Sequence, residues 1–178
     1  MSAGASTVMN RAVEMRRAFD RGFAEPTQLG QARTEDLLAI RIGAEACAIR
    51  LSEISGLFAD KKITRVPGAT AALRGIAGFR GTMLPVYDLP MLIGRGASPA
   101  PRWMVIGKAE PIALAFDGFE RQLRVPPEAV MPQSARPGVQ TCARNHLHTA
   151  DFSGPIIDLA SVFDVIRTLG AGPAFQKE

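Results

Sequence analysis

The sequence predicts an all-β domain built from two small lobes, and three observations lead to this prediction. Short stretches with a hydrophobic period of two recur along the chain, separated by turn residues, which is typical of small barrels and sandwiches. A strand–Asp–helix corner occurs twice, around Asp88 and around Asp158. The 178 residues, 47% hydrophobic and 21% charged, are enough for one ordinary domain or two small lobes.

Residues 1–34 are expected to form an amphipathic helix followed by a linker. Apolar residues recur at spacings of three and four behind a possible cap at Ser6 or Thr7. The helix either packs on its own domain or docks on a partner, because amphipathicity alone does not identify a partner. The segment has no signal-peptide core, and no apolar run in the chain reaches the length of a membrane span. A cytoplasmic protein without direct membrane insertion is therefore expected.

The first predicted strands are "LLAIRI" (37–42) and "ACAIRL" (46–51), joined by a turn at residues 43–45. The second strand would place Cys47, Ile49 and Leu51 on one face. "GIAGF" (75–79) and "TMLPVY" (82–87) form a predicted hairpin. Arg80 and Gly81 lie at its turn, where a glycine accommodates positive φ.

In the second half of the chain we predict three short strands, "WMVIG" (103–107), "PIALAF" (111–116) and "RQLRV" (121–125). The segments "LPVYDLPMLIG" (84–94) and "GPIIDLASVFDVI" (154–166) share Pro, an aliphatic residue, Asp and Leu in the same order. In each, the Asp is placed to cap the helix that follows. The second helix is expected to end at Gly170, before a tail at 171–178.

Candidate reactive groups are few. Cys47 and Cys142 belong to no C-x-x-C pair, so we expect two buried thiols rather than a disulfide. Cys142, His146, His148 and Asp151 are acceptable zinc ligands in kind. A strand through residues 146–148 would put both imidazoles on one face, however, and the sequence offers no second ligand pair at zinc-site spacing. We therefore expect no metal and no other cofactor.

The sequence also shows no convincing catalytic grouping. A Cys–His pair is possible in principle, but any cysteine and histidine meet that description. The glycine-rich segments "GRGAS" and "GIAGFRG" match neither a phosphate-binding loop nor a dinucleotide fingerprint. We expect a protein that is not an enzyme.

Two charged residues lie among apolar neighbours. Glu53 lies in "IRLSEISGLF", and Arg80 lies between Phe79 and Met83. A lone charge in such surroundings is costly unless it is paired or solvated. The sequence therefore predicts that the Glu53 carboxylate and the Arg80 guanidinium meet in a two-pronged ion pair.

Four segments, in order, resemble the CheW-like domain of bacterial chemotaxis coupling proteins. They are "LLAIRIGAEACAIRLSEISGLF", "ITRVPGATAALRGIAGFRGTMLPVYDL", "IALAFDGFERQLRVPPEAV" and "GPIIDLASVF". The resemblance runs from about Leu37 to Leu169, and its most specific part is "RVPG…LRGIAGFRGTMLPVYDL". The family's usual "NLRG" is "GFRG" here.

The resemblance implies a fold and a function. Residues 35–170 would form two SH3-like five-stranded β-barrel lobes that face each other, with an additional N-terminal helix and a short C-terminal helix. The protein would be a non-catalytic adaptor at membrane-bound receptor arrays. Its partners would be the cytoplasmic tip of a methyl-accepting chemoreceptor and the regulatory domain of a CheA-like histidine kinase. The receptor-binding residues would be Leu51, Glu53, Ile54, Phe79 and Arg80, Asp117 would be structural, and the kinase-binding residues are not identified.

Two other functions stay open. The first is a divergent CheW-like adaptor that serves a non-motility pathway or opposes array assembly. The second is a nucleic-acid-binding small barrel, since 21 Lys and Arg exceed 17 Asp and Glu. The basic residues are scattered, and one Trp and one Tyr provide no run of aromatics for base stacking. We therefore expect no nucleic-acid partner.

Overall fold

A computed structural model describes residues 33–67, 69–132 and 142–170. These residues belong to a compact unit that begins at Arg33. The predicted N-terminal helix and the C-terminal tail lie outside the described residues. The domain boundaries at residues 34 and 170 therefore stay predictions.

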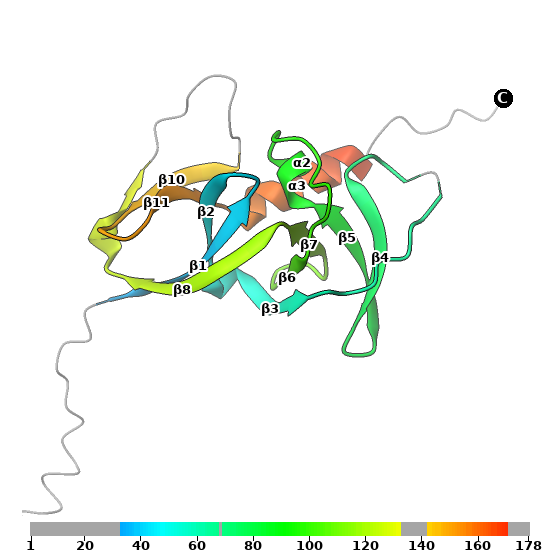
Figure 1. Cartoon of the computed structure of the whole chain (residues 1–178), viewed down its shortest axis with the longest axis horizontal. Coiled ribbons are helices and arrows are strands. Elements are labelled where there is room, and N and C mark those ends of the chain that lie inside the picture. Colours follow the sequence, from blue (N-terminus) through cyan, green and yellow to red (C-terminus); the bar gives the residue numbers. More distant parts are fainter. Residues whose placement is uncertain (1–32, 68, 133–141, 171–178) are drawn as a thin grey trace, which may run out of the picture. The chain divides into compact units, whose positions relative to one another are not determined.

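Two β-sheets and two short α-helices make up the described chain (Figure 1). Sheet A has the order β8-β1-β2-β11-β10-β9, and sheet B has the order β3-β6-β7-β5-β4. The strands of sheet A are β1 (Glu35–Ile42), β2 (Glu45–Arg50), β8 (Gly118–Val125), β9 (Val130–Pro132), β10 (Ala143–His148) and β11 (Ser153–Ile157). Those of sheet B are β3 (Ile54–Ala59), β4 (Leu73–Phe79), β5 (Thr82–Asp88), β6 (Trp103–Gly107) and β7 (Ala113–Phe116).

The two sheets are interleaved along the chain. A 3-10 turn, η1 (Leu51–Glu53), carries the chain from sheet A to sheet B after only two strands. The chain returns to sheet A at Asp117, between β7 and β8, and a second turn, η2 (Pro127–Ala129), precedes β9. Asp117 has the expected structural role: its carboxylate accepts hydrogen bonds from Gly43 N, at 2.6 Å, and from the Ser98 hydroxyl.

The prediction of an all-β fold with two lobes is confirmed, but neither predicted barrel closes among the described residues, and two further details differ. Sheet A has six strands rather than five, because the three-residue β9 pairs with β10. Strand β3 was not predicted, since Gly56 and Ser55 interrupt the alternation of its sequence. Among the described residues both sheets are open, and the Phe58 and Phe79 rings, 5.1 Å apart, bridge the edge strands β3 and β4.

One hydrophobic core serves both sheets. Buried side chains on β1 and β2 of sheet A pack in the same cluster as side chains on β6 and β7 of sheet B. The helices α2 (Leu89–Leu92) and α3 (Leu159–Gly170) contribute to this shared core. Its buried members include Ile40, Cys47, Ile49, Leu89, Val105, Leu114, Phe116, Leu159, Val162 and Phe163. The predicted face of Cys47, Ile49 and Leu51 is confirmed, with Leu51 half-buried at its margin.

The two predicted strand–Asp–helix corners are confirmed. Asp88 caps α2 by accepting from Met91 N at 3.1 Å, and Asp158 accepts from Ser161 N at 3.3 Å. Each corner follows a strand in a parallel pair, β5 with β7 and β11 with β2. The corners differ in burial. Asp88 is 1% exposed and also binds Arg74 at 2.5 Å, whereas the Asp158 side chain is 20% exposed.

This difference predicts unequal losses of stability. Asp88→Ala leaves Arg74 half-buried without its carboxylate, which costs about 3–5 kcal/mol for a buried ion pair. Asp158→Ala removes a more exposed helix cap and costs about 1 kcal/mol. Urea unfolding followed by circular dichroism measures both values. Equal losses of unfolding free energy in the two variants would contradict the different roles given to the buried, ion-paired Asp88 and the more exposed Asp158.

Both cysteines are free and buried, as expected. Burial raises the pKa of the Cys47 thiol to about 11, and burial also raises the pKa of Cys142. A thiol reacts as its thiolate, so the native protein should react slowly with a thiol reagent at about pH 8, and both thiols should react after unfolding in urea. Rapid modification of either cysteine in the native protein would contradict this prediction.

Candidate binding surface at the junction of the two sheets

The crossing segment η1 places three of the five predicted receptor-binding residues together. Leu51, Glu53 and Ile54 are half-buried, and the two apolar side chains pack at the margin of the shared core. The carbonyl of Glu53 accepts from Lys108 N at 2.8 Å, which fixes the segment against the end of β6. The junction therefore presents apolar and acidic groups from a backbone that is held on both sides.

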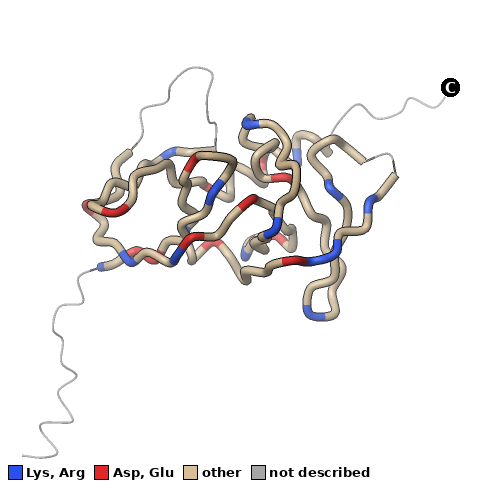
Figure 2. The backbone as a smooth tube through the Cα atoms, in the orientation of Figure 1, with Lys and Arg blue, Asp and Glu red and all other residues tan. Residues whose placement is uncertain are grey.

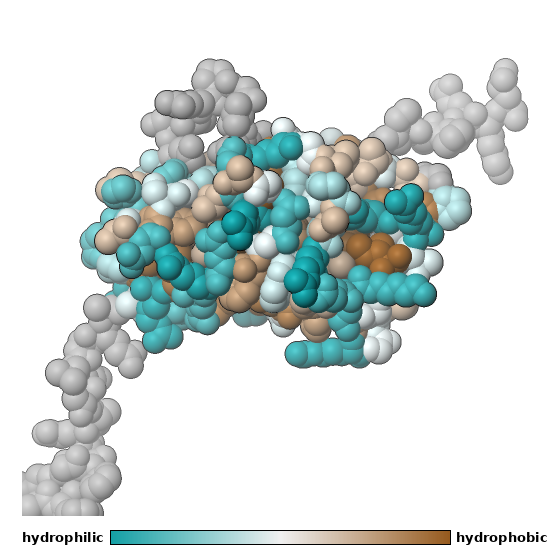
Figure 3. Space-filling model, in the orientation of Figure 1, coloured by the Kyte–Doolittle hydropathy of each residue, from teal (hydrophilic) through white to brown (hydrophobic). Residues whose placement is uncertain are grey.

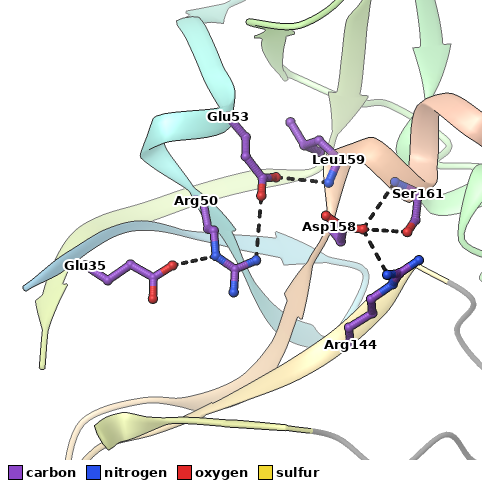
Figure 4. A network of polar contacts seen from close by, with 7 residues as sticks. All are labelled: Glu35, Arg50, Glu53, Arg144, Asp158, Leu159 and Ser161. Carbon is purple, nitrogen blue, oxygen red and sulfur yellow. Dashed lines mark hydrogen bonds and ion pairs between the residues drawn. The ribbon is translucent and has the colours of Figure 1, made fainter. Parts of the chain in front are cut away.

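The Glu53 carboxylate lies at the N-terminus of α3 (Figure 4). Its Oε2 accepts from Leu159 N at 3.0 Å, and its Oε1 lies 3.6 Å from Arg50 Nη1. Arg50 in turn donates through Nε to Glu35 at 2.5 Å. Glu53 therefore satisfies a backbone N–H that a helix terminus leaves free, and it joins η1 to α3.

Asp158, the residue directly before α3, caps the same helix terminus. Its carboxylate accepts from the Ser161 N–H and, at 2.5 Å, from the Ser161 hydroxyl. Arg144 on β10 lies 3.8 Å from the same carboxylate (Figure 4). Two carboxylates thus share one helix N-terminus, with Arg50 and Arg144 nearby to offset their repulsion.

The environment of Glu53 raises the pKa of its carboxyl group above the ordinary value. Burial is the largest cause, and the neighbouring charge of Asp158 acts in the same direction. The hydrogen bond from Leu159 and the charge of Arg50 oppose the change. The ionised carboxylate of Glu53 therefore loses part of its favourable hydration at this junction, as burial of a charged group requires.

The predicted ion pair between Glu53 and Arg80 is wrong. Glu53 pairs with Arg50, three residues earlier, and none of the ion pairs between described residues includes Arg80. Glu53 precedes β3, whereas Arg80 contacts Phe58 near the far end of β3. A strand of this length spans roughly 15–20 Å, so the two charged groups occupy different ends of it.

Arg80 lies at the tip of the β4–β5 hairpin, at the predicted turn. Its φ is +48° and that of Gly81 is +86°, the left-handed pair that a two-residue hairpin turn of type I′ requires. Arg80 is exposed, and its guanidinium carbon lies 5.8 Å from the centre of the Phe58 ring. The hairpin thus holds a cation over an aromatic ring at one end of sheet B.

Phe79 lies beneath this surface rather than on it. It is 3% exposed and packs in the cluster of buried side chains specific to sheet B. Its two neighbours in the chain, Gly78 and Arg80, are exposed. Phe79 therefore has a supporting position: its buried ring packs edge-on against the Phe58 ring that faces Arg80.

Sequence reasoning missed Arg50, Phe58 and Lys61 as parts of these surfaces. Arg50 lies three residues before Glu53. Oppositely charged residues at this spacing can meet across one helical turn, and this pattern could have identified Arg50 as the ion-pair partner of Glu53. Phe58 and Lys61 gave no such signal, because their contacts with Arg80 and Phe79 form only when β3 and the segment after it lie beside the hairpin.

The candidate metal ligands do not converge. Strand β10 contains His146 and His148 on one face, paired with Pro155 and Ser153 of β11. Cys142 is 2% exposed and belongs to the shared core, away from that face. In residues 33–67, 69–132 and 142–170, no three His, Cys, Asp or Glu side chains gather as a metal site.

Two interleaved sheets around one shared core define a β-rich domain with two lobes. The CheW-like domain model matches residues 36–167, and the chain belongs to this family of chemotaxis scaffold proteins. No helix in the described part of the chain is long and apolar enough to cross a membrane.

One curated protein resembles this chain in sequence, and one solved structure resembles it in fold. A probable chemotaxis protein CheW of Rhizobium etli is 26% identical over 101 residues, which cover 54% of this chain and 65% of the relative. The match thus spans slightly less than two thirds of that protein. The scaffolding protein TtCheW of Thermoanaerobacter tengcongensis has a similar fold, with a TM-score of 0.65 and 21% identity over 74% of this chain and 94% of TtCheW.

The raised pKa of Glu53 predicts a pH dependence of stability. The folded protein binds this proton more tightly than the unfolded chain, so the stability due to Glu53 falls as the pH rises from its ordinary pKa of 4.5 through the raised value. Glu53→Gln does not titrate at this position. The unfolding free energy of the wild type minus that of the variant should therefore fall from about pH 4 to about pH 7. Urea unfolding measures it, with the exposed Glu128→Gln as control, and a rising difference would contradict the prediction.

Proposed function

We propose that this protein is a non-catalytic adaptor that couples the cytoplasmic tips of chemoreceptors to a CheA-like histidine autokinase. Membership of the CheW-like family and the two-sheet fold support this proposal. The adaptor would act in the cytoplasm, at membrane-bound receptor arrays. Its output would be a set of binding free energies rather than a chemical reaction.

The observation that carries the proposal is the junction between the sheets. Residues 51–54 present Leu51 and Ile54 beside the Glu53 carboxylate, on a segment fixed by β6 and by α3. Half-buried apolar side chains next to a fixed charge are suited to binding, since the surface loses little freedom when a partner docks. A receptor tip would contact Leu51, Glu53 and Ile54 here.

Arg80 is the second proposed contact. Exposed arginines supported by aromatic rings are frequent among the residues that dominate binding energies. Phe58 lies under its guanidinium, and the buried Phe79 supports the base of the hairpin. In this proposal Phe79 acts through Arg80 and does not itself contact the receptor.

Binding of a soluble chemoreceptor cytoplasmic fragment tests these sites. Arg80→Ala and Leu51→Ala should each weaken binding roughly tenfold, because each removes a side chain expected to lie within the contact. Arg33→Ala, an exposed position on the chain leading into β1, is the control and should bind as the wild type does. Isothermal titration calorimetry measures the affinities, and circular dichroism verifies the fold.

Wild-type affinity of Arg80→Ala would remove Arg80 from the proposed site. Kinase coupling needs a separate measurement, in which autophosphorylation of a CheA-like kinase is followed with receptor-containing membranes and increasing adaptor. The adaptor function predicts that wild-type protein makes the kinase respond to the receptor. An inhibition of kinase activity that grows with adaptor concentration would favour an antagonist of array assembly instead.

A further inference from the structure

The end of sheet B that carries the β4–β5 hairpin has more positive charge than its own carboxylates neutralise. Lys61, Lys62 and Arg65 lie on the segment from β3 to β4, and Arg80 lies at the hairpin tip (Figure 2). None of these four cations forms an ion pair with a described carboxylate. The adjacent Asp60 binds Arg102 instead, at 2.8 Å and 3.1 Å.

One aromatic ring brings two of these cations together. Lys61 Nζ lies 5.5 Å from the centre of the Phe58 ring, and the Arg80 guanidinium carbon lies 5.8 Å from the same centre. Lys61 also lies 5.9 Å from the Phe79 ring. An aromatic ring attracts cations without neutralising them, so two like charges are held at one place and their field extends into solvent.

The remaining cations extend this charge along the edge of the sheet. Thr64 pairs with Ile76 of β4 through hydrogen bonds of 2.8 Å and 2.9 Å, which fixes the neighbouring Arg65 beside this strand. Lys62 and Arg65 are both exposed. The positive charge is therefore attached to ordered backbone along β4 and at the hairpin tip.

The same region exposes apolar side chains. Met83, near the hairpin tip, is 58% exposed, and Val66 is 40% exposed. Figure 3 shows a hydrophobic patch over β4 and β5 with hydrophilic side chains around it. Exposed aliphatic groups beside cations favour a protein partner over nucleic acid, because a phosphate backbone offers nothing apolar for Met83 to contact.

We propose that this basic hairpin surface, formed by Lys61, Lys62, Arg65, Arg80 and Met83, selects an acidic, partly apolar helical face of its partner. The proposal rests on the proposed function, in which that partner is the chemoreceptor tip. Carboxylates three or four residues apart lie on one face of a helix and would oppose the cations, with an aliphatic residue against Met83. Lys61 and Lys62 set the charge preference and the association rate, while Arg80 supplies the central contact.

Association rates of a chemoreceptor cytoplasmic fragment with the full chain test the proposal. The double variant K61Q/K62Q should associate about three- to tenfold more slowly than the wild type at about 50 mM salt, because the long-range attraction is reduced. Its rate should also depend less on salt up to about 300 mM. The control R33Q/R121Q removes the same number of charges from exposed positions outside the basic hairpin surface and should associate at nearly the wild-type rate.

A second probe separates this proposal from the proposed function. It is a Glu-rich amphipathic helical peptide, compared with its Gln-substituted form. If the wild type binds the acidic peptide in a lysine-dependent way but not the receptor fragment, the proposed function fails and the acidic-helix preference stands. If K61Q/K62Q and R33Q/R121Q slow association equally, the proposed preference for an acidic helix is overturned, since the change in net charge alone would explain both slower rates. Lysine-dependent binding of DNA or of phosphatidylserine vesicles, without binding of the acidic peptide, would overturn it as well.

Discussion

The apolar core shared by the two sheets is the constraint on which the rest of the structure depends. Side chains of β1 and β2 pack in the same cluster as those of β6, β7, α2 and α3. Each sheet also has a smaller core of its own, but neither smaller core contains Leu89, Leu159 or Phe116. Loss of either sheet would expose the shared cluster to water, and the free energy gained from its burial favours folding of both sheets as one unit.

The polar groups at the junction follow from this shared core. An α-helix that starts in a buried place must satisfy its first N–H groups without water. Asp88 does so for α2, and Asp158 with Glu53 does so for α3. Because Glu53 belongs to the crossing segment, the same carboxylate that completes α3 also fixes the chain where it passes between the sheets. The proposed receptor contact is therefore attached to a segment that hydrogen bonds hold from both sides.

The sequence predicted those features that local chemistry determines. Alternation of apolar residues identified most strands, Asp88 and Asp158 identified the helix starts, and Gly81 identified the hairpin turn. The partner of Glu53 was predicted wrongly because apolar surroundings show that a carboxylate needs a cation but do not show whether Arg50 or Arg80 is nearer. The interleaving of the sheets and the contact of Phe58 with the hairpin depend on strand order, which no local pattern encodes.

Strand β3 gives the two proposed contact regions a fixed separation. Residues 51–54 lie at its start, and Phe58, which holds Arg80 and Lys61, lies near its end. The strand pairs with β6 from Ile54 to Ala59, with one register shift between Ile54 and Gly56, and this pairing holds the backbone distance, roughly 15–20 Å. A helix rises about 1.5 Å per residue, so a partner helix that touches both regions must extend along β3 for about three turns. Two moderate contacts at a fixed spacing on one rigid strand then act together, and a partner that reaches only one of them loses most of the affinity.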